Sequence, residues 1–209
     1  MDVLKQKIVI VDYGMGNLHS VSKKLNRIGV NSLVSGLRNE IKLADKIILP
    51  GVGHFAKAME NLKNMELIET LNEFALIDKK PVLGICLGMQ LMAMRSEEGN
   101  SAGLGWFDAG VVKFKINDNL KYKVPHTGWN TLLRSKKSML LTDISENAEF
   151  YFVHAYHFEN KTKEDILTET DYEYRFCSAV EKTNIFGVQF HPEKSHDAGE
   201  IMFRNFVAL

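Results

Sequence analysis

Pro81-Val-Leu-Gly-Ile-Cys86-Leu-Gly-Met-Gln-Leu-Met-Ala-Met94 is the most informative stretch of the sequence. An apolar strand pattern (81–85) passes directly into a helical pattern (87–94) at a cysteine. Gly84 and Gly88 lie two residues before and two residues after Cys86, which gives the form G-x-C-x-G. This is the pattern of a nucleophile elbow, with sulfur in place of the serine oxygen. Glycines are needed there because a sharp turn brings neighbouring backbones too close for a Cβ atom.

The N-terminal half alternates short apolar runs with helical patterns. Three runs precede the strand at 81–85, and they cover residues 7–12, 31–34 and 46–49. One helix between them has an N-cap at Asn17, a stop at Gly29 and apolar residues at helical spacing: Leu18, Val21, Leu25 and Ile28. A second helix has Leu67, Leu71, Phe74 and Ala75. This order predicts an α/β fold with an open, mostly parallel twisted sheet, helices on both faces and a ligand at the carboxyl ends of the strands.

The second half of the sequence has a different pattern of secondary-structure signals. Short strand patterns separated by turns predict a smaller antiparallel or mixed portion, at residues 110–116, 130–133, 149–153, 174–180 and 185–190. A final helix carries one apolar stripe, formed by Ala198, Met202, Phe206 and Leu209. The chain has no repeat, linker or low-complexity segment, so we expect a single domain over residues 1–209.

Composition gives no support to several classes of protein. Lys and Arg number 26 and Asp and Glu number 26, so no net charge favours nucleic acid or an anionic membrane as a partner. No apolar run approaches a membrane span or a signal peptide, which predicts a soluble, cytoplasmic protein. Cys86 and Cys177 lie far apart without CxxC spacing, so neither a disulfide scaffold nor a zinc ribbon is indicated.

A candidate base follows the strand pattern at 185–190, in His191-Pro192-Glu193. Residues two apart in an extended chain face the same side, and Pro192 disfavours a helical conformation for His191. A carboxylate beside an imidazole fixes its tautomer and stabilises the imidazolium ion. We therefore expect Glu193 to orient His191, provided that this strand ends beside Cys86. The alternative is a surface histidine next to a capping glutamate.

The same turn offers groups that stabilise negative charge. A cysteine at a helix N-terminus faces free N–H groups and the positive end of the dipole, which favour a thiolate. The Leu87 N–H would point at a developing oxyanion. A second donor could come from the glycine-rich turn Pro50-Gly51-Val52-Gly53-His54-Phe55. The alternative for Cys86 is a small buried apolar residue in a tight turn.

Two other patterns give weak signals. Gly14-Met-Gly16-Asn-Leu-His19 lacks the third glycine of a dinucleotide-binding loop. His154 and His157, taken with a cysteine or His191, match no standard spacing of metal ligands. We therefore expect neither a cofactor nor a metal.

Several further motifs accompany the cysteine and the histidine. They are Asp12-Tyr-Gly-Met-Gly-Asn17, Pro50-Gly-Val-Gly-His-Phe55, Glu97-Glu98, Pro125-His-Thr-Gly-Trp-Asn130, Tyr151-Phe-Val-His154 and Gln189-Phe-His-Pro-Glu-Lys194. With these motifs the chain resembles, from end to end, the triad (class I) glutamine amidotransferases, and among them the glutaminase subunits of imidazole glycerol phosphate synthase.

The resemblance implies a reaction and a set of residues. Cys86 would attack the side-chain amide of L-glutamine and form a thioester, with His191 moving protons and Glu193 orienting it. Gln90 and Glu98 would hold the glutamine, Gly53 would line its pocket, and Val52 or Gly53 would supply the second oxyanion amide. No cofactor is implied.

The resemblance also implies a partner. A cyclase (synthase) subunit would form a heterodimer with this chain and use its ammonia to make imidazole glycerol phosphate and AICAR in histidine biosynthesis. The positions expected to face this partner are Pro125, His126, Gly128, Trp129, Asn130 and Lys194. Thr127 stands where the family often has Met, and Ala155 where a hydroxyl residue is common. The sequence around Lys194 is also similar to that of relatives that supply ammonia to a surface-sugar amidotransferase.

Two readings from other classes stay open on the residues alone. One is a stand-alone cysteine hydrolase of peptides or small amides, which would need neither glutamine nor a partner. The other is a binding module that keeps the fold without catalysis. A glutamine-mimicking electrophile that labels Cys86 would contradict the second.

Overall fold

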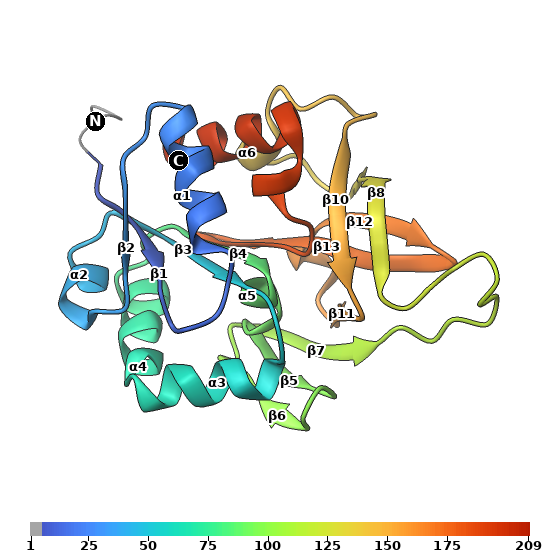
Figure 1. The fold of residues 1–209 in the computed structure, drawn as a ribbon, viewed down its shortest axis with the longest axis horizontal. Helices are drawn as coiled ribbons and strands as arrows, with labels where there is room; N and C mark the ends of the chain where they lie inside the picture. The colour runs from blue at the N-terminus through green and yellow to red at the C-terminus, as the bar shows by residue number, and fades with distance from the viewer. Residues whose placement is uncertain (1–5) are drawn as a thin grey trace.

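The computed structural model describes residues 6–209, and a large mixed sheet forms its centre (Figure 1). One part of this sheet is parallel, and its strands lie in the order β2 (Ser32–Ser35), β1 (Ile8–Val11), β3 (Lys46–Gly51), β4 (Val82–Cys86) and β14 (Ile185–Val188). The α/β prediction is therefore confirmed. The fifth parallel strand, β14, comes from near the end of the chain and lies beside β4. This pairing brings two segments together that are far apart in the sequence.

Helices cover both faces of the parallel strands. On one face lie α1 (Leu18–Arg27) and α6 (His196–Ala208), and on the other lie α3 (Phe55–Asn64) and α4 (Leu67–Asn72) (Figure 1). The alternation of side chains in β1 divides the core accordingly. Ile8 and Ile10 belong to the same apolar cluster as the buried residues of α1 and α6, whereas Val9 and Val11 belong to that of α3 and α4. A short α2 (Arg38–Lys42) lies beside β1, and a π-helical turn, Glu73–Ile77, continues α4.

The helix signals in the sequence are confirmed for α1. The Asn17 side chain accepts a hydrogen bond from the Ser20 N–H, as an N-cap does. The helix ends at Arg27, and Gly29 has a φ of 82°, a conformation in which glycine has no Cβ penalty.

The second part of the sheet is mainly antiparallel. From β14 it continues through β13 (Tyr174–Lys182), β11 (Tyr156–Asn160), β7 (Phe107–Lys113), β5 (Ala93–Ser96) and β6 (Ser101–Ala102). Off this path, β12 (Ile166–Tyr172) pairs with β13, and β9 (Leu133–Arg134) pairs with β12. A separate antiparallel pair consists of β8 (His126–Thr131) and β10 (Glu149–His154). The predicted antiparallel portion is confirmed, although β11 and β12 were not expected from the pattern.

The clearest difference between the predicted and observed elements lies directly after Cys86. The helical pattern at 87–94 forms α5 only over Leu87–Gln90, and Ala93 already begins β5. Tertiary structure explains this difference. β5 pairs in parallel with β7, with Ala93 opposite Phe107, so hydrogen bonds between strands replace the hydrogen bonds that would continue the helix. Met92 and Ala93 are buried at this change of direction.

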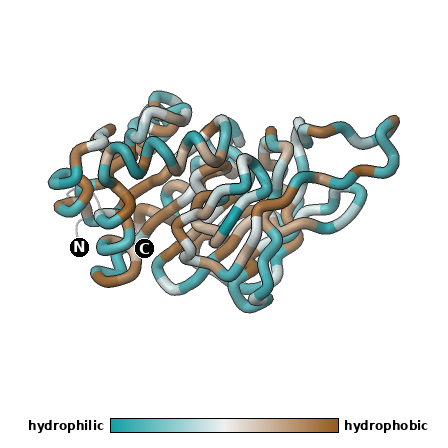
Figure 2. The backbone as a smooth tube through the Cα atoms, turned by 90° about the horizontal axis from the view of Figure 1, so that it is seen from below, coloured by the Kyte–Doolittle hydropathy of each residue, from teal (hydrophilic) through white to brown (hydrophobic). Residues whose placement is uncertain are grey.

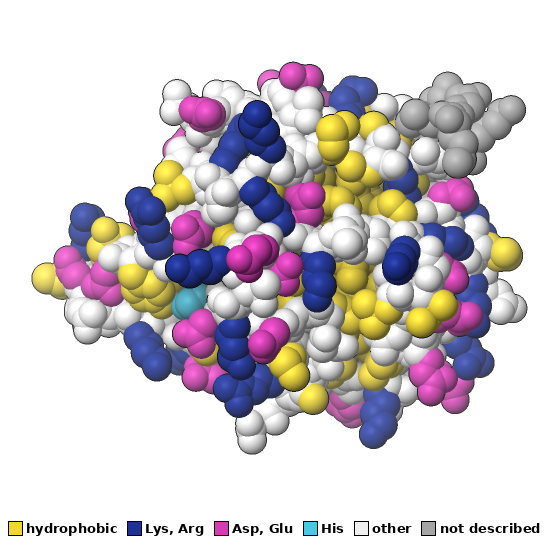
Figure 3. All heavy atoms as spheres, turned by 180° about the vertical axis from the view of Figure 1, so that it is seen from behind, with side chains coloured by type: hydrophobic (Ala, Val, Ile, Leu, Met, Phe, Trp, Pro, Cys, Tyr) yellow, Lys and Arg dark blue, Asp and Glu magenta, His cyan; other side chains and the backbone are white. Residues whose placement is uncertain are grey.

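The part of the chain that the structure describes also contains three short helical turns and one protruding segment. Single 3-10 turns occur at Met139–Leu141, Lys163–Asp165 and Pro192–Lys194. The chain between β7 and β8 extends away from the body of the molecule (Figures 1 and 2). On the rear face, positive and negative side chains are interspersed (Figure 3).

Within residues 6–209, no helix has the length and apolar character needed to cross a membrane.

Candidate active site

Cys86 lies at the junction between β4 and α5, as the glycine pattern predicts. Its φ of 54° and ψ of −110° are unusual for a residue with a side chain and are typical of a nucleophile elbow. An added Cβ on Gly88 would overlap the Leu49 carbonyl oxygen of β3, and one on Gly84 would come within 2.8 Å of the Gly88 backbone. The two glycines therefore let α5 pack directly against the strands.

The segment after β14 brings the predicted base close to the predicted nucleophile. β14 pairs in parallel with β4, with Val188 opposite Ile85, so the chain that follows β14 emerges beside Cys86. The Tyr151 carbonyl accepts a hydrogen bond of 2.9 Å from the His191 N–H, which anchors this segment to β10. This strand pairing is the condition on which the predicted Cys86–His191 arrangement depends.

Glu193 and His191 are joined by a short hydrogen bond. His191 Nδ1 lies 2.7 Å from Glu193 Oε1, and both side chains are almost completely buried. The expected reason for this pairing was an extended chain, which is wrong beyond His191. Pro192–Lys194 form a 3-10 turn, and that turn folds the Glu193 carboxylate back toward the ring. Proline is well suited to this first helical position because its fixed φ matches the turn.

Two opposing influences act on the imidazole. Burial lowers the pKa of His191, but Cys86 and Glu193 together outweigh it and raise the pKa to about 10. His191 Nε2 and Glu193 Oε2 have no hydrogen-bond partner among residues 6–209. The site therefore favours a protonated imidazole beside the sulfur, with Nε2 left available for proton transfer.

A cavity of about 310 Å³ opens above the sulfur. Its lining combines the turn after β3, the elbow and the end of β10: Val52, Gly53, Cys86, Leu87, Gln90, Glu98, Pro125, Val153, His154, Ala155 and Tyr156. The structure thus brings together the predicted nucleophile, oxyanion and substrate-binding residues. Pro125, expected at a partner surface, also reaches this cavity. Val153 and Tyr156 were not predicted, because nothing in their local pattern indicates that they would line a cavity.

The glycine-rich turn after β3 lies next to Cys86. Gly51 is paired with Cys86 in the sheet, so Val52 and Gly53 follow at the edge of the cavity. Gly53 has a φ of 116°, which favours glycine. Below the turn, Tyr13 is fully buried and donates a hydrogen bond of 2.8 Å to the Pro50 carbonyl, which holds the turn in place.

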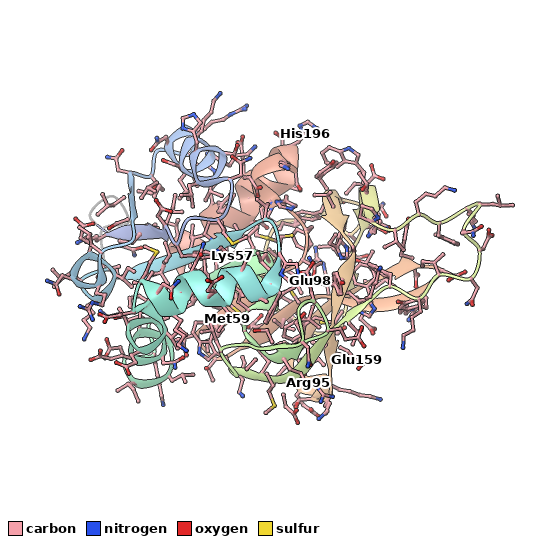
Figure 4. The ribbon with its side chains drawn as sticks, turned by 60° about the horizontal axis from the view of Figure 1, so that its bottom comes forward. Lys57, Met59, Arg95, Glu98, Glu159 and His196 are labelled. Atoms are coloured by element: carbon pink, nitrogen blue, oxygen red, sulfur yellow. The ribbon has the colours of Figure 1, made fainter. Side chains whose placement is uncertain are left out.

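Gln90 and Glu98 are both held by the protein. Gln90 Nε2 donates to the Tyr156 carbonyl and to Gln189 Oε1, each at 3.0 Å. Glu98 Oε2 accepts a hydrogen bond of 2.7 Å from the N–H of Phe55, the first residue of α3, and Figure 4 shows Glu98 at this end of the helix. Gln189 is fully buried, and its Nε2 lies 3.6 Å from Cys86 Sγ. Nothing in the sequence alone predicts a role for Gln189.

The expected partner-facing residues gather around β8. Trp129 is 42% exposed and stacks on His196 with ring centroids 4.8 Å apart. Lys194 Nζ lies over the Tyr151 ring, 5.4 Å from its centroid. Gly128 lies on the same strand, and Asn130 Nδ2 donates to the Asp171 carbonyl. His126 differs from these residues, because its side chain is buried.

His126 belongs to a buried group of histidines and aromatic rings. Its Nδ1 lies 3.1 Å from His154 Nε2, and the carbonyl of Tyr156 accepts a hydrogen bond of 2.8 Å from His154 Nδ1. Burial lowers the pKa of His126 to about 4 and that of His154 well below its usual value. Residues 6–209 contain no group of three His, Cys, Asp or Glu side chains arranged to hold a metal ion.

Comparison with known proteins agrees with this geometry. Residues 9–209 match the family model "Glutamine amidotransferase class-I". The HisH 2 protein of imidazole glycerol phosphate synthase from Pseudomonas aeruginosa is 46% identical over 202 residues, covering 97% of this chain and 99% of that protein. The HisH 2 protein from Methanococcus maripaludis is 48% identical over 200 residues, covering 96% and 98%.

Solved structures support the fold. A putative GMP synthase protein from Thermoplasma acidophilum has a TM-score of 0.71 at 21% identity, covering 97% of this chain and 92% of that one. PurLQS from Thermotoga maritima has a TM-score of 0.72 at 18% identity, covering 98% of each chain. Taken with the sequence relatives, these findings show that the chain belongs to the class-I glutamine amidotransferases, and among them to the HisH subunits of imidazole glycerol phosphate synthase.

Proposed function

We propose that residues 1–209 act as one glutaminase domain that hydrolyses L-glutamine and passes the ammonia to a cyclase subunit in histidine biosynthesis. The observation that carries the proposal is the buried His191–Glu193 pair beside Cys86, and Cys86 itself lines a cavity of about 310 Å³. A nucleophile, a base and an orienting carboxylate form the constellation needed for amide hydrolysis through a covalent intermediate.

The reaction proceeds in two halves. Cys86 Sγ attacks the side-chain carbonyl carbon of glutamine, and the electron pair of the C=O bond moves onto oxygen. The N–H groups of Leu87 and of the Val52–Gly53 turn stabilise this oxyanion. His191 gives its proton to the leaving nitrogen, and the C–N bond breaks to release ammonia. A water molecule, deprotonated by His191, then attacks the thioester carbonyl, the C–S bond breaks with its electron pair on sulfur, and glutamate leaves.

Gln90 and Glu98 recognise the amino-acid end of glutamine in this proposal. Both hydrogens of Gln90 Nε2 are used by Tyr156 and Gln189, so Gln90 Oε1 is the atom available to accept a hydrogen bond from the α-ammonium group. The Glu98 carboxylate adds a negative charge to the same cavity. Gly53 leaves room along the cavity wall because it has no side chain.

The partner binds at the β8 side of the cavity in this proposal. Pro125 lines the cavity, and Trp129 and Lys194 lie on the neighbouring exposed surface. An exposed tryptophan is typical of a protein interface. We propose a heterodimer that works in the cytoplasm, without a cofactor, a nucleic acid or a membrane.

Glutamate release from glutamine tests the proposal. The purified chain is measured alone and together with the organism's cyclase, which is loaded with its phosphoribosyl-formimino carboxamide nucleotide. We expect strong stimulation by the loaded partner and no turnover in Cys86→Ala. Cys86→Ala should still bind the partner, because the cysteine lies inside the cavity and not on the exposed surface.

A second acceptor is favoured by two residues. Thr127 is exposed on β8 and Ala155 lines the cavity, and both are positions where the sequence departs from the usual family pattern. If a glutamine analogue labels Cys86 while the nucleotide-loaded cyclase gives no stimulation, the ammonia serves another acceptor, such as a surface sugar. If the chain instead cleaves peptides or small amides with no partner, it is a stand-alone hydrolase and the proposal is wrong.

A further inference from the structure

We infer that Gln189 is a further catalytic residue, whose side-chain amide donates a hydrogen bond to Cys86 Sγ and stabilises the thiolate. This inference rests on the proposed function for its chemistry. Gln189 Nε2 lies 3.6 Å from Cys86 Sγ, a hydrogen-bond distance for the larger sulfur atom, and the Gln189 side chain is fully buried. Gln189 comes two residues before His191, so the segment that directly follows β14 supplies both the base and this donor.

The orientation of the amide is fixed by its neighbours. Gln90 Nε2 donates to Gln189 Oε1 at 3.0 Å, so the oxygen of Gln189 is turned away from the sulfur and the NH₂ group is turned toward it. In the opposite orientation, two NH₂ groups would face each other and a carbonyl oxygen would face the thiolate. A buried amide that cannot rotate is a preorganised donor, because no reorganisation is needed when charge develops.

A longer chain of hydrogen bonds supports this orientation. Gln90 Nε2 also donates to the Tyr156 carbonyl, which accepts a second hydrogen bond from His154 Nδ1 at 2.8 Å. Gln90 is therefore held at both hydrogens, and its amide cannot rotate without breaking one of these bonds. The position of Gln189 thus depends on groups from α5, β14 and the β10–β11 region.

The hydrogen bond acts at both ends of the reaction. Before attack, it stabilises the sulfur anion that forms when the thiol proton moves to His191. As the C–S bond forms, the charge passes to the carbonyl oxygen and the hydrogen bond weakens. When the thioester is hydrolysed, the C–S bond breaks and its electron pair returns to sulfur, which again accepts from Gln189 Nε2. The amide transfers no proton in either half.

Alkylation of Cys86 by iodoacetamide, followed at the Cys86 peptide by mass spectrometry from pH 5 to 10, tests the inference without glutamine turnover. Gln189→Met removes the donor and keeps the length of the side chain. Gln189→Asn keeps an amide but shortens its reach. We expect alkylation of both variants at pH 7 to be about tenfold slower, with the acid limb of the rate profile about one pH unit higher. Rates should converge at alkaline pH.

Ser178→Ala is the matched control. Ser178 is also fully buried and hydrogen-bonded through its side chain, to Thr168 at 2.9 Å. Within residues 6–209, Cys86 Sγ is hydrogen-bonded to Gln189 and not to Ser178. Its rate profile should stay within twofold of that of the parent chain. Burial raises the pKa of Cys177, so its protection from alkylation reports that each variant remains folded.

Two results would overturn the inference. One is an unchanged profile in folded Gln189→Met or Gln189→Asn. The other is an equal reduction at every pH, which would show a steric effect on reagent access and not stabilisation of the thiolate. A failure of glutamine hydrolysis in the parent chain would reject the proposed function but leave this measurement intact.

Discussion

His126 Nδ1 lies 3.1 Å from His154 Nε2, between a strand of the expected partner surface and the wall of the catalytic cavity. The carbonyl of Tyr156 can only accept, so His154 Nδ1 carries a proton and its Nε2 accepts from His126 Nδ1. His126 is also stacked between the rings of Phe152 and Tyr172, at 4.9 and 3.9 Å. Burial lowers the pKa of both histidines, which favours the neutral form of each in the folded chain.

This arrangement predicts a loss of stability in mild acid. Burial lowers the pKa of His126 to about 4, against an ordinary value near 6.5 in the unfolded chain. Below pH 6.5 the unfolded chain binds the proton and the folded chain does not, so the free energy of unfolding falls until about pH 4. The slope is at most about 1.4 kcal/mol per pH unit for each such histidine. His126→Asn should reduce this slope, as measured by urea unfolding between pH 7.5 and 5.

The exposed His19 provides the control for that experiment. His19→Asn should leave the slope as it is, because its side chain is in water in both states. A slope that is the same in His126→Asn and in the parent chain would contradict the neutral, buried histidine pair.

Glu193→Ala should reduce turnover less than substitution of Cys86, which bonds to the substrate, or of His191, which transfers protons. Cys86→Ala and His191→Ala each remove a reacting group, whereas Glu193→Ala leaves the imidazole in place but frees its orientation. We expect Glu193→Ala to retain roughly two orders of magnitude more glutaminase activity than either of the other two variants. The comparison uses glutamate release with the activated partner present. Equal loss in all three would assign Glu193 a direct part in the chemistry.

The Cys86 elbow was predictable because its determinants are local. Two glycines, a strand pattern and a helical pattern occupy consecutive positions, and each has a steric reason. The His191–Glu193 contact was predicted correctly but for an incomplete reason, since the 3-10 turn after His191 depends on packing under α6. Gly199 shows this packing, because an added Cβ there would overlap the Pro192 carbonyl oxygen.

The role of Gln189 could not be predicted, because every one of its side-chain partners comes from a distant segment. Gln90 and Cys86 precede it by 99 and 103 residues. The parallel pairing of β14 with β4 places them together, and long-range strand pairing leaves no local pattern in a sequence. For the same reason Tyr156 was not expected in the cavity. A single sequence gives the chemistry of the elbow but not the neighbours that complete it.

Gly88 should be intolerant of a methyl group. A Cβ at this position would overlap the Leu49 backbone, which belongs to the buried strand β3 and cannot move aside. We expect Gly88→Ala to lower the free energy of unfolding by about 3 kcal/mol or more. In Gly110→Ala, which has open space at the Cβ position, the change should be within about 0.5 kcal/mol. Urea unfolding of both variants measures these free energies. Equal stability of Gly88→Ala and Gly110→Ala would mean that α5 can shift away from β3.

Glu98 has two separable roles, and a pair of variants distinguishes them. Its Oε2 accepts from the N–H of Phe55 at the start of α3, and its carboxylate also lines the cavity. Glu98→Ala removes the helix-capping acceptor and the charge, so it should lower the free energy of unfolding by about 1 kcal/mol and raise KM for glutamine. Glu98→Gln keeps an acceptor for Phe55 but loses the charge, so it should raise KM with a smaller effect on stability.

Glu97→Ala is the control for Glu98, because Glu97 is exposed and accepts from the Lys113 N–H, and it is not part of the cavity lining. Its KM should equal that of the parent chain. If Glu98→Gln also leaves KM unchanged while Glu98→Ala unfolds more easily, Glu98 serves α3 alone. The α-ammonium group of glutamine would then be recognised by Gln90 Oε1 and the backbone of the cavity. That result would remove Glu98 from the substrate site without affecting the assignment of Cys86, His191 and Glu193.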